Sequence, residues 1–274
     1  MSGATLFEMP RSDKPRLTDL PVSVIDLDAR GATSVRGESD HDGQSSRSGF
    51  SPFPPQVAQF CCELFLRDAT RVVDPFAGWG ERGAACVRAG KQYVGFDTSP
   101  DAIEHARTEY GVVNTLADAK SAPIPTHDGL LTCPPYWNVE RYAGAGLDAA
   151  PTWQAFLDGY AAILARCASM AAHGSTYCVV VGDWRAENAY HDLTYQTERV
   201  LDSLGFAPFD KVILSRLRTS KVKIMIPQAL RLGYTVKVHE TLLVYRRLTI
   251  AVESATAKSV RGAAQRRQVS VRKG

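Results

Sequence analysis

Hydrophobic and polar positions follow two periods in turn along most of the chain, which predicts alternating strands and helices. Short apolar runs predict strands, and apolar positions repeated every three to four residues predict helices. The expected strands are 71–74, 93–97, 112–116, 129–132, 177–181, 209–214 and 236–245, and the expected helices are 56–66, 81–89, 99–110, 152–172 and 194–204. This order favours right-handed crossovers and a mainly parallel sheet covered by helices on both faces. The last two strands fit a hairpin at one edge.

The two ends of the chain differ from this middle part. Residues 28–49 are rich in Gly, Ser, Arg and Asp and have almost no apolar anchor, which predicts a flexible segment. Before them, only residues 22–27, with the sequence VSVIDL, favour a short strand. The last 17 residues carry six basic and no acidic side chains, which is typical of an unfolded tail. We therefore expect an N-terminal extension over 1–49, one domain over 50–250 and a basic tail over 251–274.

Composition predicts a globular protein with a full core. Of the 274 residues, 45% are hydrophobic and 22% are charged, and the net charge is +3. The chain has no apolar run of about 18 residues and no signal-peptide core at its N-terminus, so we expect a cytoplasmic protein without a membrane partner. The six cysteines form no CxxC pair and the histidines have no ligand spacing, so reduced, buried thiols and no metal site are expected.

A glycine-rich turn follows the first strand of the expected domain. Residues 72–83, with the sequence VVDPFAGWGERG, place Gly78, Gly80 and Gly83 in GxGxxG spacing between a strand and a helix. Glycine allows the backbone to turn tightly there and lets a ligand approach the main chain. By itself the spacing fits a dinucleotide-binding enzyme almost as well as a methyltransferase.

Three aspartates near this turn point to a cationic adenosine derivative as the ligand. Asp74 ends its strand, where a carboxylate can hold a cationic sulfonium amino acid. Asp97 ends the next strand, nineteen residues after Gly78, where a carboxylate can accept both ribose hydroxyls. The alternative for this pair is a plain strand-turn-helix with a solvated Asp97. Asp118 follows the third strand and is either an acceptor for the adenine amino group or an exposed loop residue.

A second motif, Cys133-Pro134-Pro135-Tyr136, follows the expected strand 129–132. Two prolines end a strand and lock the backbone, because each fixes φ and removes a donor. A rigid carbonyl beside them can point into a cleft as an acceptor, and the aromatic ring offers a stacking surface for a flat ligand. An exocyclic amine is a poor nucleophile because its lone pair is spread into the ring. Acceptors that take both of its hydrogens favour a pyramidal nitrogen, which can attack a methyl sulfonium directly.

Together the two motifs resemble those of the S-adenosylmethionine-dependent amino-methyltransferases of DNA, which act on adenine N6 or cytosine N4. Residues 74–80 match the DPFxGxG cofactor loop, and residues 133–136 match three of four positions of the (Asp/Asn/Ser)-Pro-Pro-(Tyr/Phe/Trp) catalytic loop. Residues 50–60 are similar to the motif before the cofactor loop, and residues 238–246 to the closing strand. The resemblance covers about residues 50–247, with the cofactor loop before the catalytic loop.

The resemblance implies a Rossmann-like, doubly wound class I methyltransferase sheet of seven strands with a terminal antiparallel hairpin, and S-adenosylmethionine as the cofactor. It also implies that Pro134 offers its carbonyl to the amine and that Tyr136 stacks on a flipped base. The expected catalytic residues are Cys133, Pro134, Pro135 and Tyr136, and the expected cofactor-binding residues are Phe53, Pro54, Asp74, Pro75, Phe76, Gly78, Gly80, Asp97 and Asp118.

Cys133 departs from the family pattern, because a thiol is a weaker acceptor than a carboxylate, an amide or a hydroxyl. Similar chains with Cys-Pro-Pro-Tyr occur among phage-type methylases, so the substitution is compatible with activity. It leaves open which base is methylated and which group is transferred. The alternative is a covalent cysteine nucleophile of the cytosine-C5 type, but that chemistry places its cysteine after a proline, the reverse of the order here.

Residues on the same edge of the expected sheet are candidates for contact with DNA, the expected partner. Trp137 and Tyr142 either form an aromatic loop at the base pocket or cap the core, and Asp183 is either a substrate contact or part of a structural loop. Segment 215–235 is basic and has no acidic residue. We expect it to be a loop that contacts phosphates or reads guanine, with a solvated basic hairpin as the alternative. Its expected DNA contacts are Arg216, Arg218, Lys221 and Lys223.

Three other functions stay open on the sequence. A nicotinamide-dependent oxidoreductase uses the same glycine spacing, but it gives no reason for Cys-Pro-Pro-Tyr. A catalytically inactive relative would bind DNA without methyl transfer. A methyltransferase of the same fold that acts on RNA or on a protein amide would use a similar loop, since Asn-Pro-Pro-Tyr serves there too.

Overall fold

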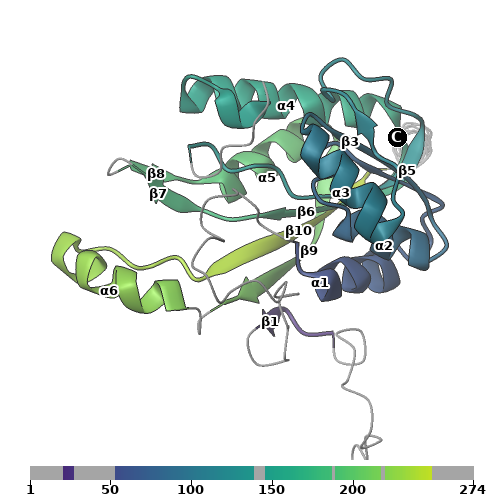
Figure 1. Ribbon diagram of the computed structural model, residues 1–274. Helices are drawn as coiled ribbons and strands as arrows, with labels where there is room; N and C mark the ends of the chain where they lie inside the picture. The colour runs from purple at the N-terminus through teal and green to yellow at the C-terminus, as the bar shows by residue number, and fades with distance from the viewer. Residues whose placement is uncertain (1–20, 28–52, 139–145, 187–188, 217–219, 249–274) are drawn as a thin grey trace, which may run out of the picture.

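The computed structural model describes residues 21–27, 53–138, 146–186, 189–216 and 220–248, without the side chains of 220–223. These residues form a central sheet flanked by helices (Figure 1). The order of strands in the sheet is β1-β9-β10-β6-β5-β2-β3-β4. The strands are β1 (Val24–Asp26), β2 (Arg71–Asp74), β3 (Gln92–Asp97), β4 (Thr115–Leu116), β5 (His127–Thr132), β6 (Ala171–Val181), β9 (Phe206–Ser215) and β10 (His239–Arg247).

The sheet is mainly parallel and has a Rossmann-like strand order. Strands β4, β3, β2, β5 and β6 are parallel, and β10 lies antiparallel between β6 and β9, which confirms the expected terminal hairpin. The expected number of seven strands is wrong. Strand β1 pairs in parallel with β9, from Val24 opposite Ile213 to Asp26 opposite Ser215, so the described residues form a sheet of eight strands. The short strand expected at 22–27 therefore extends the edge of the sheet.

Helices cover both faces of the sheet (Figure 1). In β6, Cys178 and Val180 belong to the core cluster on one face, whereas Tyr177, Val179 and Val181 belong to the cluster on the other. This alternation follows from the two-residue period of a strand, and it is why a parallel sheet covered on both faces is apolar throughout. The first face packs against α1 (Pro55–Phe60), the π-helix that continues it (Cys61–Phe65) and α2 (Glu81–Arg88). Helix α3 (Pro100–Tyr110) lies beside α2. Helices α4 (Trp153–Met170) and α5 (Leu193–Ser203) cover the second face.

Two glycines of the GxGxxG spacing allow α2 to pack closely on its neighbours. Gly80 begins α2 with a φ of +108°, and a Cβ there would lie 2.9 Å from the Cα of Ala106 in α3. A Cβ on Gly83 would lie 2.7 Å from side-chain atoms of both Tyr93 and Val112. The glycines at these two positions therefore serve the packing of a helix against a strand and a second helix.

Segment 215–235 differs from its expectation, because most of it is a helix and not a loop. Helix α6 spans Ser220–Leu232 and contains Pro227. Apart from that proline, it is rich in residues with good helix propensity, such as Lys, Met, Gln, Ala, Leu and Arg, and this preference outweighs the charge pattern that suggested a loop. Figure 1 shows α6 projecting away from the sheet. Its exposed apolar side chains are Ile224, Met225, Ile226, Leu230 and Leu232.

A small hairpin that the hydrophobic pattern did not predict follows β6. Strands β7 (Trp184–Ala186) and β8 (Ala189–His191) pair antiparallel and project from the same end of the sheet as α6 (Figure 1). No described helix is both long and apolar enough to cross a membrane. Among the described side chains, no three His, Cys, Asp or Glu residues are grouped as the ligands of a metal ion would be.

Candidate active site

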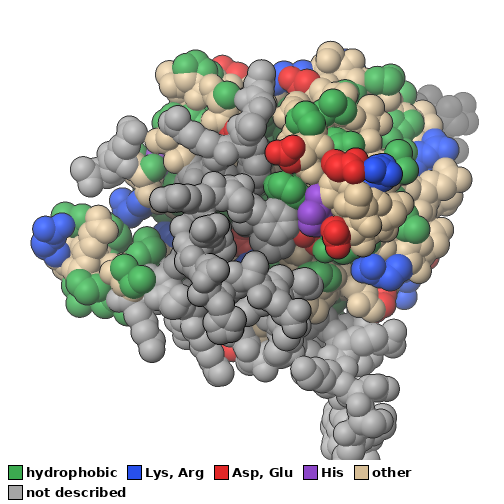
Figure 2. Space-filling view, in the orientation of Figure 1, with side chains coloured by type: hydrophobic (Ala, Val, Ile, Leu, Met, Phe, Trp, Pro, Cys, Tyr) green, Lys and Arg blue, Asp and Glu red, His purple; other side chains and the backbone are tan. Residues whose placement is uncertain are grey.

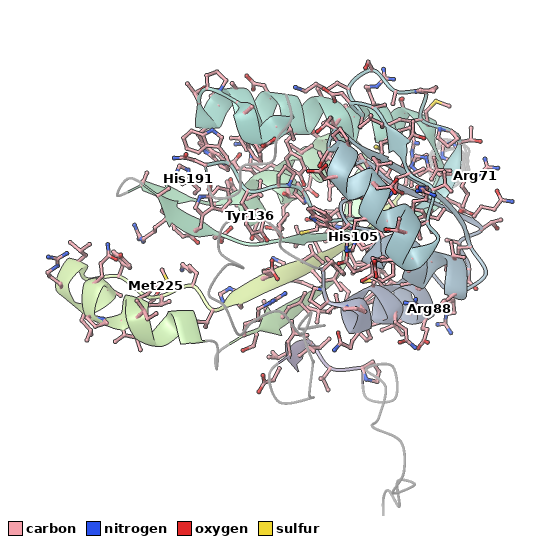
Figure 3. The ribbon with its side chains drawn as sticks, viewed as in Figure 1. Arg71, Arg88, His105, Tyr136, His191 and Met225 are labelled. Atoms are coloured by element: carbon pink, nitrogen blue, oxygen red, sulfur yellow. The ribbon has the colours of Figure 1, made fainter. Side chains whose placement is uncertain are left out.

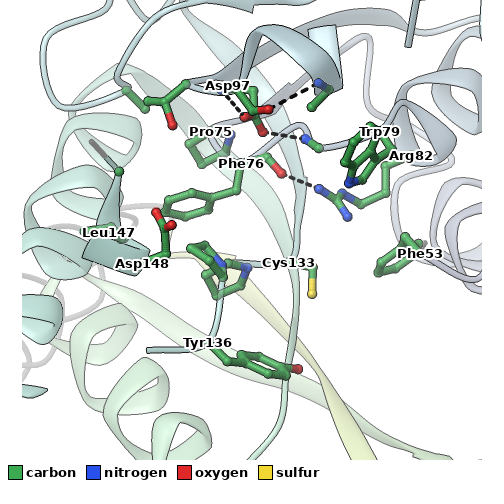
Figure 4. A pocket seen from close by; sticks show the side chains of 18 of the residues that line it. Phe53, Pro75, Phe76, Trp79, Arg82, Asp97, Cys133, Tyr136, Leu147 and Asp148 are labelled. Atoms are coloured by element: carbon green, nitrogen blue, oxygen red, sulfur yellow. Dashed lines mark hydrogen bonds between the residues drawn. The ribbon is translucent and has the colours of Figure 1, made fainter. Parts of the chain in front are cut away.

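A pocket opens at the edge where the parallel strands end, which is the place where open α/β sheets bind ligands. Its walls come from the turns after β2, β3, β4 and β5 and from residues that precede α1 or begin α2 (Figure 4). The open space between these walls, including the mouth, is about 1100 Å³. This space includes open solvent at the mouth, so it is larger than the space that a ligand would fill.

The carboxylate of Asp74 lies beneath this pocket and not in its lining. It is fully buried. It accepts hydrogen bonds from Thr132 Oγ1 at 2.6 Å and from the Tyr93 hydroxyl at 3.2 Å, and Arg82 Nε pairs with it at 2.7 Å. The expectation that Asp74 holds a cationic group of the ligand is therefore corrected. The chain's own Arg82 neutralises this carboxylate, which joins β2 to β3, to β5 and to α2.

Arg82 holds the glycine-rich turn from the buried side of the pocket wall. Burial by itself lowers the pKa of the guanidinium, but the charge of Asp74, with smaller contributions from Cys133 and Tyr93, raises it above the ordinary value. Arg82 also donates to the carbonyl of Phe76, and its guanidinium lies 4.9 Å from the ring centre of Phe53. One buried cation thus contacts both the turn after β2 and the segment before α1.

Asp97 lies in the pocket at the end of β3, beside the glycine-rich turn (Figure 4). Its Oδ2 accepts the N–H of Gly78 at 2.8 Å and its Oδ1 accepts the N–H of Ser99 at 2.9 Å. Burial raises the pKa of Asp97, and these two N–H groups oppose the rise. A carboxylate has about four acceptor positions, so each oxygen can still accept a hydroxyl. The geometry suits two adjacent hydroxyls of one ligand.

Asp118 follows β4 and lines the same side of the pocket. Its Oδ1 accepts the N–H of Lys120 at 2.8 Å. No described residue donates a hydrogen bond to its other oxygen. Asp118 therefore offers an acceptor to a ligand that is held at Asp97, and Pro75, Phe76 and Ile163 supply apolar surface in the same pocket.

Glu81, at the start of α2, is a buried carboxylate in the pocket lining that the sequence analysis did not single out. It is 4% exposed. Burial raises its pKa, while backbone N–H groups, among them that of Phe53, oppose the rise. No described cation forms an ion pair with it. Glu81 is therefore placed to receive a cationic group from a ligand, the role expected for Asp74.

The turn Cys133-Pro134-Pro135-Tyr136 lines another part of the pocket, at the end of β5 (Figure 4). Pro134 is buried, yet no described residue donates a hydrogen bond to its carbonyl. Because Pro134 also lines the pocket, its carbonyl is available as an acceptor to a donor that enters there.

The ring of Tyr136 is held from two sides. It stacks on Trp184 with ring centres 5.2 Å apart and planes at 20°. Its hydroxyl donates to Oε1 of Glu240 at 2.7 Å, and Oε2 of Glu240 pairs with Arg216 at 3.4 Å. Tyr136, Glu240 and Arg216 all line the pocket. Because Trp184 covers one face of the ring, the other is the face that a flat ligand would meet.

Two residues expected to contact DNA have structural partners and lie outside the pocket lining. Trp137 donates from Nε1 to the carbonyl of Ala150 at 2.9 Å and packs among aromatic rings. Asp183 accepts the backbone N–H of Thr194 at the start of α5 at 2.9 Å and the hydroxyl of Tyr190 at 2.8 Å. For Trp137 the structure therefore favours the alternative that its ring caps the core. For Asp183 it favours the alternative that the residue belongs to a structural loop. Gly80 also lies outside the lining, where it serves helix packing.

The remaining expected DNA contacts are placed only in part. Arg216 lines the pocket through its contact with Glu240. Lys221 and Lys223 belong to α6, but their side chains lie outside the described residues, as do Tyr142 and Arg218 altogether. Of the other expected residues, the lining contains Phe53, Pro54, Pro75, Phe76, Gly78, Asp97, Asp118, Cys133, Pro134, Pro135 and Tyr136.

Charged side chains in the lining favour a ligand that carries positive charge. The carboxylates are Glu81, Asp97, Asp118, Asp148 and Glu240, and the cations are Arg82, Lys120 and Arg216. Some of these residues stood in recognisable motifs: Glu81 and Arg82 follow the glycine-rich turn, and Glu240 lies in the segment that resembles the closing strand. Lys120 and Asp148 lie in no motif, and only the folded chain brings them to the pocket.

Comparison with known proteins gives similarity of fold and no family. No model of a protein family matches the chain, and no curated protein matches it. Similar solved structures include TrmN from Thermus thermophilus, with 18% identity, a TM-score of 0.49, and coverage of 74% of this chain and 51% of that one. Another is magnesium protoporphyrin IX methyltransferase (ChlM) from Synechocystis PCC 6803 with bound SAM, with 14% identity, a TM-score of 0.46, and coverage of 70% and 79%. The chain therefore spans about half the length of TrmN.

A third similar structure is the 1,6-didemethyltoxoflavin-N1-methyltransferase of Burkholderia thailandensis with bound 1,6-didemethyltoxoflavin and S-adenosylhomocysteine. It has 15% identity and a TM-score of 0.46, and the match covers 71% of this chain and 78% of that one. At such identities the similarity concerns the fold alone.

Proposed function

We propose that the protein is an S-adenosylmethionine-dependent methyltransferase that modifies the exocyclic amino group of a DNA base, adenine N6 or cytosine N4. One observation carries the proposal. The unpaired carbonyl of Pro134 and the held ring of Tyr136 share a pocket with Asp97 and the glycine-rich turn. An acceptor for an amine, a stacking face and an acceptor for a vicinal diol are the groups that this reaction requires.

Residues on one side of the pocket suit the cofactor. Asp97 has an acceptor position left on each oxygen for the two ribose hydroxyls, and Asp118 has one for the adenine amino group. Glu81, and not Asp74, is the carboxylate placed for the ammonium of the methionine part, because it lies in the lining without a described ion-pair partner. The excess of carboxylates over cations also suits a cationic cofactor. Bound S-adenosylmethionine supplies an electrophilic methyl group.

Residues on the other side suit a flat amine. The carbonyl of Pro134 accepts one amine hydrogen, which favours a pyramidal nitrogen with its lone pair free for the methyl group. The ring of Tyr136 stacks on the base, and such stacking is worth about 1–3 kcal/mol. This offsets part of the few kcal/mol that removal of a base from the duplex costs. Cys133, beside Pro134, is a second and weaker acceptor.

DNA is the substrate that the residues favour. The two motifs resemble those of the DNA amino-methyltransferases, and segment 215–235 is basic without an acidic residue. An RNA base and a protein amide are the alternative substrates of the same chemistry. A nicotinamide-dependent oxidoreductase would have no use for the unpaired carbonyl of Pro134.

Mass spectrometry of nucleosides tests the proposal. The full chain is incubated with duplex DNA and a cofactor that carries a deuterated methyl group, and the digested DNA should contain labelled N6-methyladenine or N4-methylcytosine. Asp97→Ala should greatly reduce the label, whereas the matched variant Asp101→Ala, at an exposed position of α3 outside the pocket, should keep it. Label in RNA or in protein amides alone would refute the DNA proposal. A chain that binds cofactor and DNA but labels nothing would be an inactive relative.

A further inference from the structure

Two cations and two tyrosines, none of which has an individual role in the proposed function, cluster near the pocket. Arg185 and Tyr190 belong to the β7–β8 hairpin, and Tyr234 and Lys237 to the segment between α6 and β10. The guanidinium of Arg185 lies 5.3 Å from the ring centre of Tyr190 and 5.0 Å from that of Tyr234. The ammonium of Lys237 lies 5.0 Å from the ring centre of Tyr190. These four residues are called the rim cluster below.

The register of the hairpin places its members of the rim cluster on the outer face. Trp184 pairs with His191, and Arg185 pairs with Tyr190. Successive residues of a strand point to opposite faces. Trp184 and His191 pack inward against the ring of Trp153, with ring centres 5.5 and 4.9 Å away, and Figure 3 shows His191 at this hairpin. The inner pair anchors the hairpin, and the outer pair is left on its opposite face.

Both segments of the rim cluster lead directly to Tyr136. Trp184, the neighbour of Arg185 in the chain, stacks on Tyr136. Glu240, three residues after Lys237, accepts the hydrogen bond of the Tyr136 hydroxyl. A polymer whose base stacks on Tyr136 would therefore have its flanking backbone close to the rim cluster.

The cations of the rim cluster have no anionic partner in the described chain. Arg185 and Lys237 are exposed, and neither forms an ion pair with a described residue. The nearby carboxylate of Asp183 is bound by the hydroxyl of Tyr190 and by a backbone N–H of α5. Residues 215–239 contain five further Lys or Arg residues besides Lys237 and no acidic one. Figure 2 shows basic side chains at one end of α6 and in the region between α6 and the rest of the molecule.

We propose that the rim cluster binds the target strand of DNA beside the base that enters the pocket. Arg185 and Lys237 contact backbone phosphates, and the rings of Tyr190 and Tyr234 support the cations and stack on an adjacent unpaired base. Cations interleaved with aromatic rings are what grooves for a single nucleic-acid strand are built from. This inference rests on the proposed function and adds to it the surface that holds the substrate.

The test is a double variant, Arg185→Gln with Lys237→Gln, in the full chain. Fluorescence anisotropy with a labelled DNA duplex at several salt concentrations should show affinity roughly ten-fold lower and a salt slope flatter by about 2, since each lost phosphate contact removes about 0.9. The matched control is Arg88→Gln with Arg199→Gln, which removes the same charge from exposed sites. Arg199 also lies over a tyrosine ring, that of Tyr195, at 5.8 Å, so the control removes an equivalent contact. Cofactor affinity should be unchanged in both.

The outcomes separate this inference from the proposed function. If the wild-type chain methylates DNA and the rim variant keeps the wild-type salt slope, the rim cluster has no role in binding and the proposed function stands. If the rim variant loses DNA affinity but the wild-type chain methylates no base, the surface is supported and the proposed function fails. A loss of affinity confined to RNA would overturn the inference, because the surface would then hold a different polymer.

Discussion

The hydroxyl of Tyr136 donates a 2.7 Å hydrogen bond to Glu240, a residue 104 positions further along the chain. The bond joins the turn after β5 to the start of β10, and the stacking of Tyr136 on Trp184 joins the same ring to β7. Three separate segments therefore fix one aromatic face. A base that meets this face is oriented without further movement of the ring, which is the condition for efficient transfer to a positioned amine.

We expect Tyr136→Ala to lower the rate of methyl transfer by a factor of about 10–100, because a stacking face worth about 1–3 kcal/mol is lost. Cofactor affinity should be nearly unchanged, since the ring faces the substrate. Tyr136→Phe keeps the ring and loses only the bond to Glu240, so its rate should lie between those of the wild type and the alanine variant. Single-turnover rates and calorimetry measure the two quantities. Equal losses in both variants would mean that the hydroxyl, and not the ring, is what matters.

Asp97→Ala should weaken the binding of S-adenosylmethionine by ten-fold or more, which corresponds to about 1.4 kcal/mol. The reason is the loss of both acceptor oxygens beside Gly78. Isothermal titration calorimetry measures the affinity, and circular dichroism shows whether the variant is folded. An unchanged affinity in a folded variant would remove Asp97 from the cofactor site.

The affinity for the cofactor should also fall on acidification, at a higher pH than an ordinary aspartate would cause. Burial raises the pKa of Asp97 above its usual 3.8. The ionised form accepts both hydroxyls, so affinity is full above the raised pKa and falls as the pH drops through it. Glu81 also has a pKa raised by burial and should contribute in the same direction. Calorimetry at several pH values should show a smaller pH dependence in Asp97→Asn. The same dependence in that variant would assign the effect to another group.

Cys133→Ser should remain active, and its rate should equal or exceed that of the wild type. A hydroxyl is a better acceptor than a thiol, and serine is a residue that the resembling family uses at this position. Methyl transfer to duplex DNA measures the rate. An inactive serine variant, together with a covalent DNA adduct trapped on the wild-type chain, would mean that Cys133 attacks a pyrimidine ring. That result would contradict the amino-methylation mechanism.

Asp74→Ala should lower the free energy of unfolding by about 3–5 kcal/mol, because it leaves the buried charge of Arg82 without its partner. Denaturant unfolding measures the loss. The matched control is Glu104→Ala, which breaks the exposed pair with Arg107, in which both side chains are 60% exposed, and its loss should be much smaller because solvent screens the pair. Similar losses in the two variants would contradict the role given to Asp74.

Much of the fold could be predicted from local sequence pattern, because buried strands and helices repeat hydrophobic positions at their own periods, and helices also begin with recognisable capping residues. Strand β5 and helix α3 lie within two residues of their expected bounds, and α3 begins with Pro100 behind a Ser99 cap that accepts a 3.3 Å bond. Helix α6 was missed because its charges suggested a loop, and the β7–β8 hairpin because its strands are only three residues long.

The sequence predicts those pocket residues that stand in motifs. It does not predict the ion pairs and contacts between residues that are far apart in the chain. Asp97 and the turn at Pro134 lie at strand ends, and both are in the lining. The sequence does not reveal that Arg82 neutralises Asp74, since that depends on how α2 packs on the sheet. For the same reason it could not show that Glu81 is the carboxylate left open to a ligand.

The contacts of Asp74 also bear on how this chain could change its target. One carboxylate bonds Thr132, which precedes the turn 133–136, and Arg82, which holds the glycine-rich turn, so these two sides of the pocket keep a constant spacing. The hairpin β7–β8 and helix α6 lie outside this buried unit (Figure 1). Under the proposed function, grafts that exchange these two outer segments would therefore alter which molecule is presented for methylation, while the distance over which the methyl group travels stays the same.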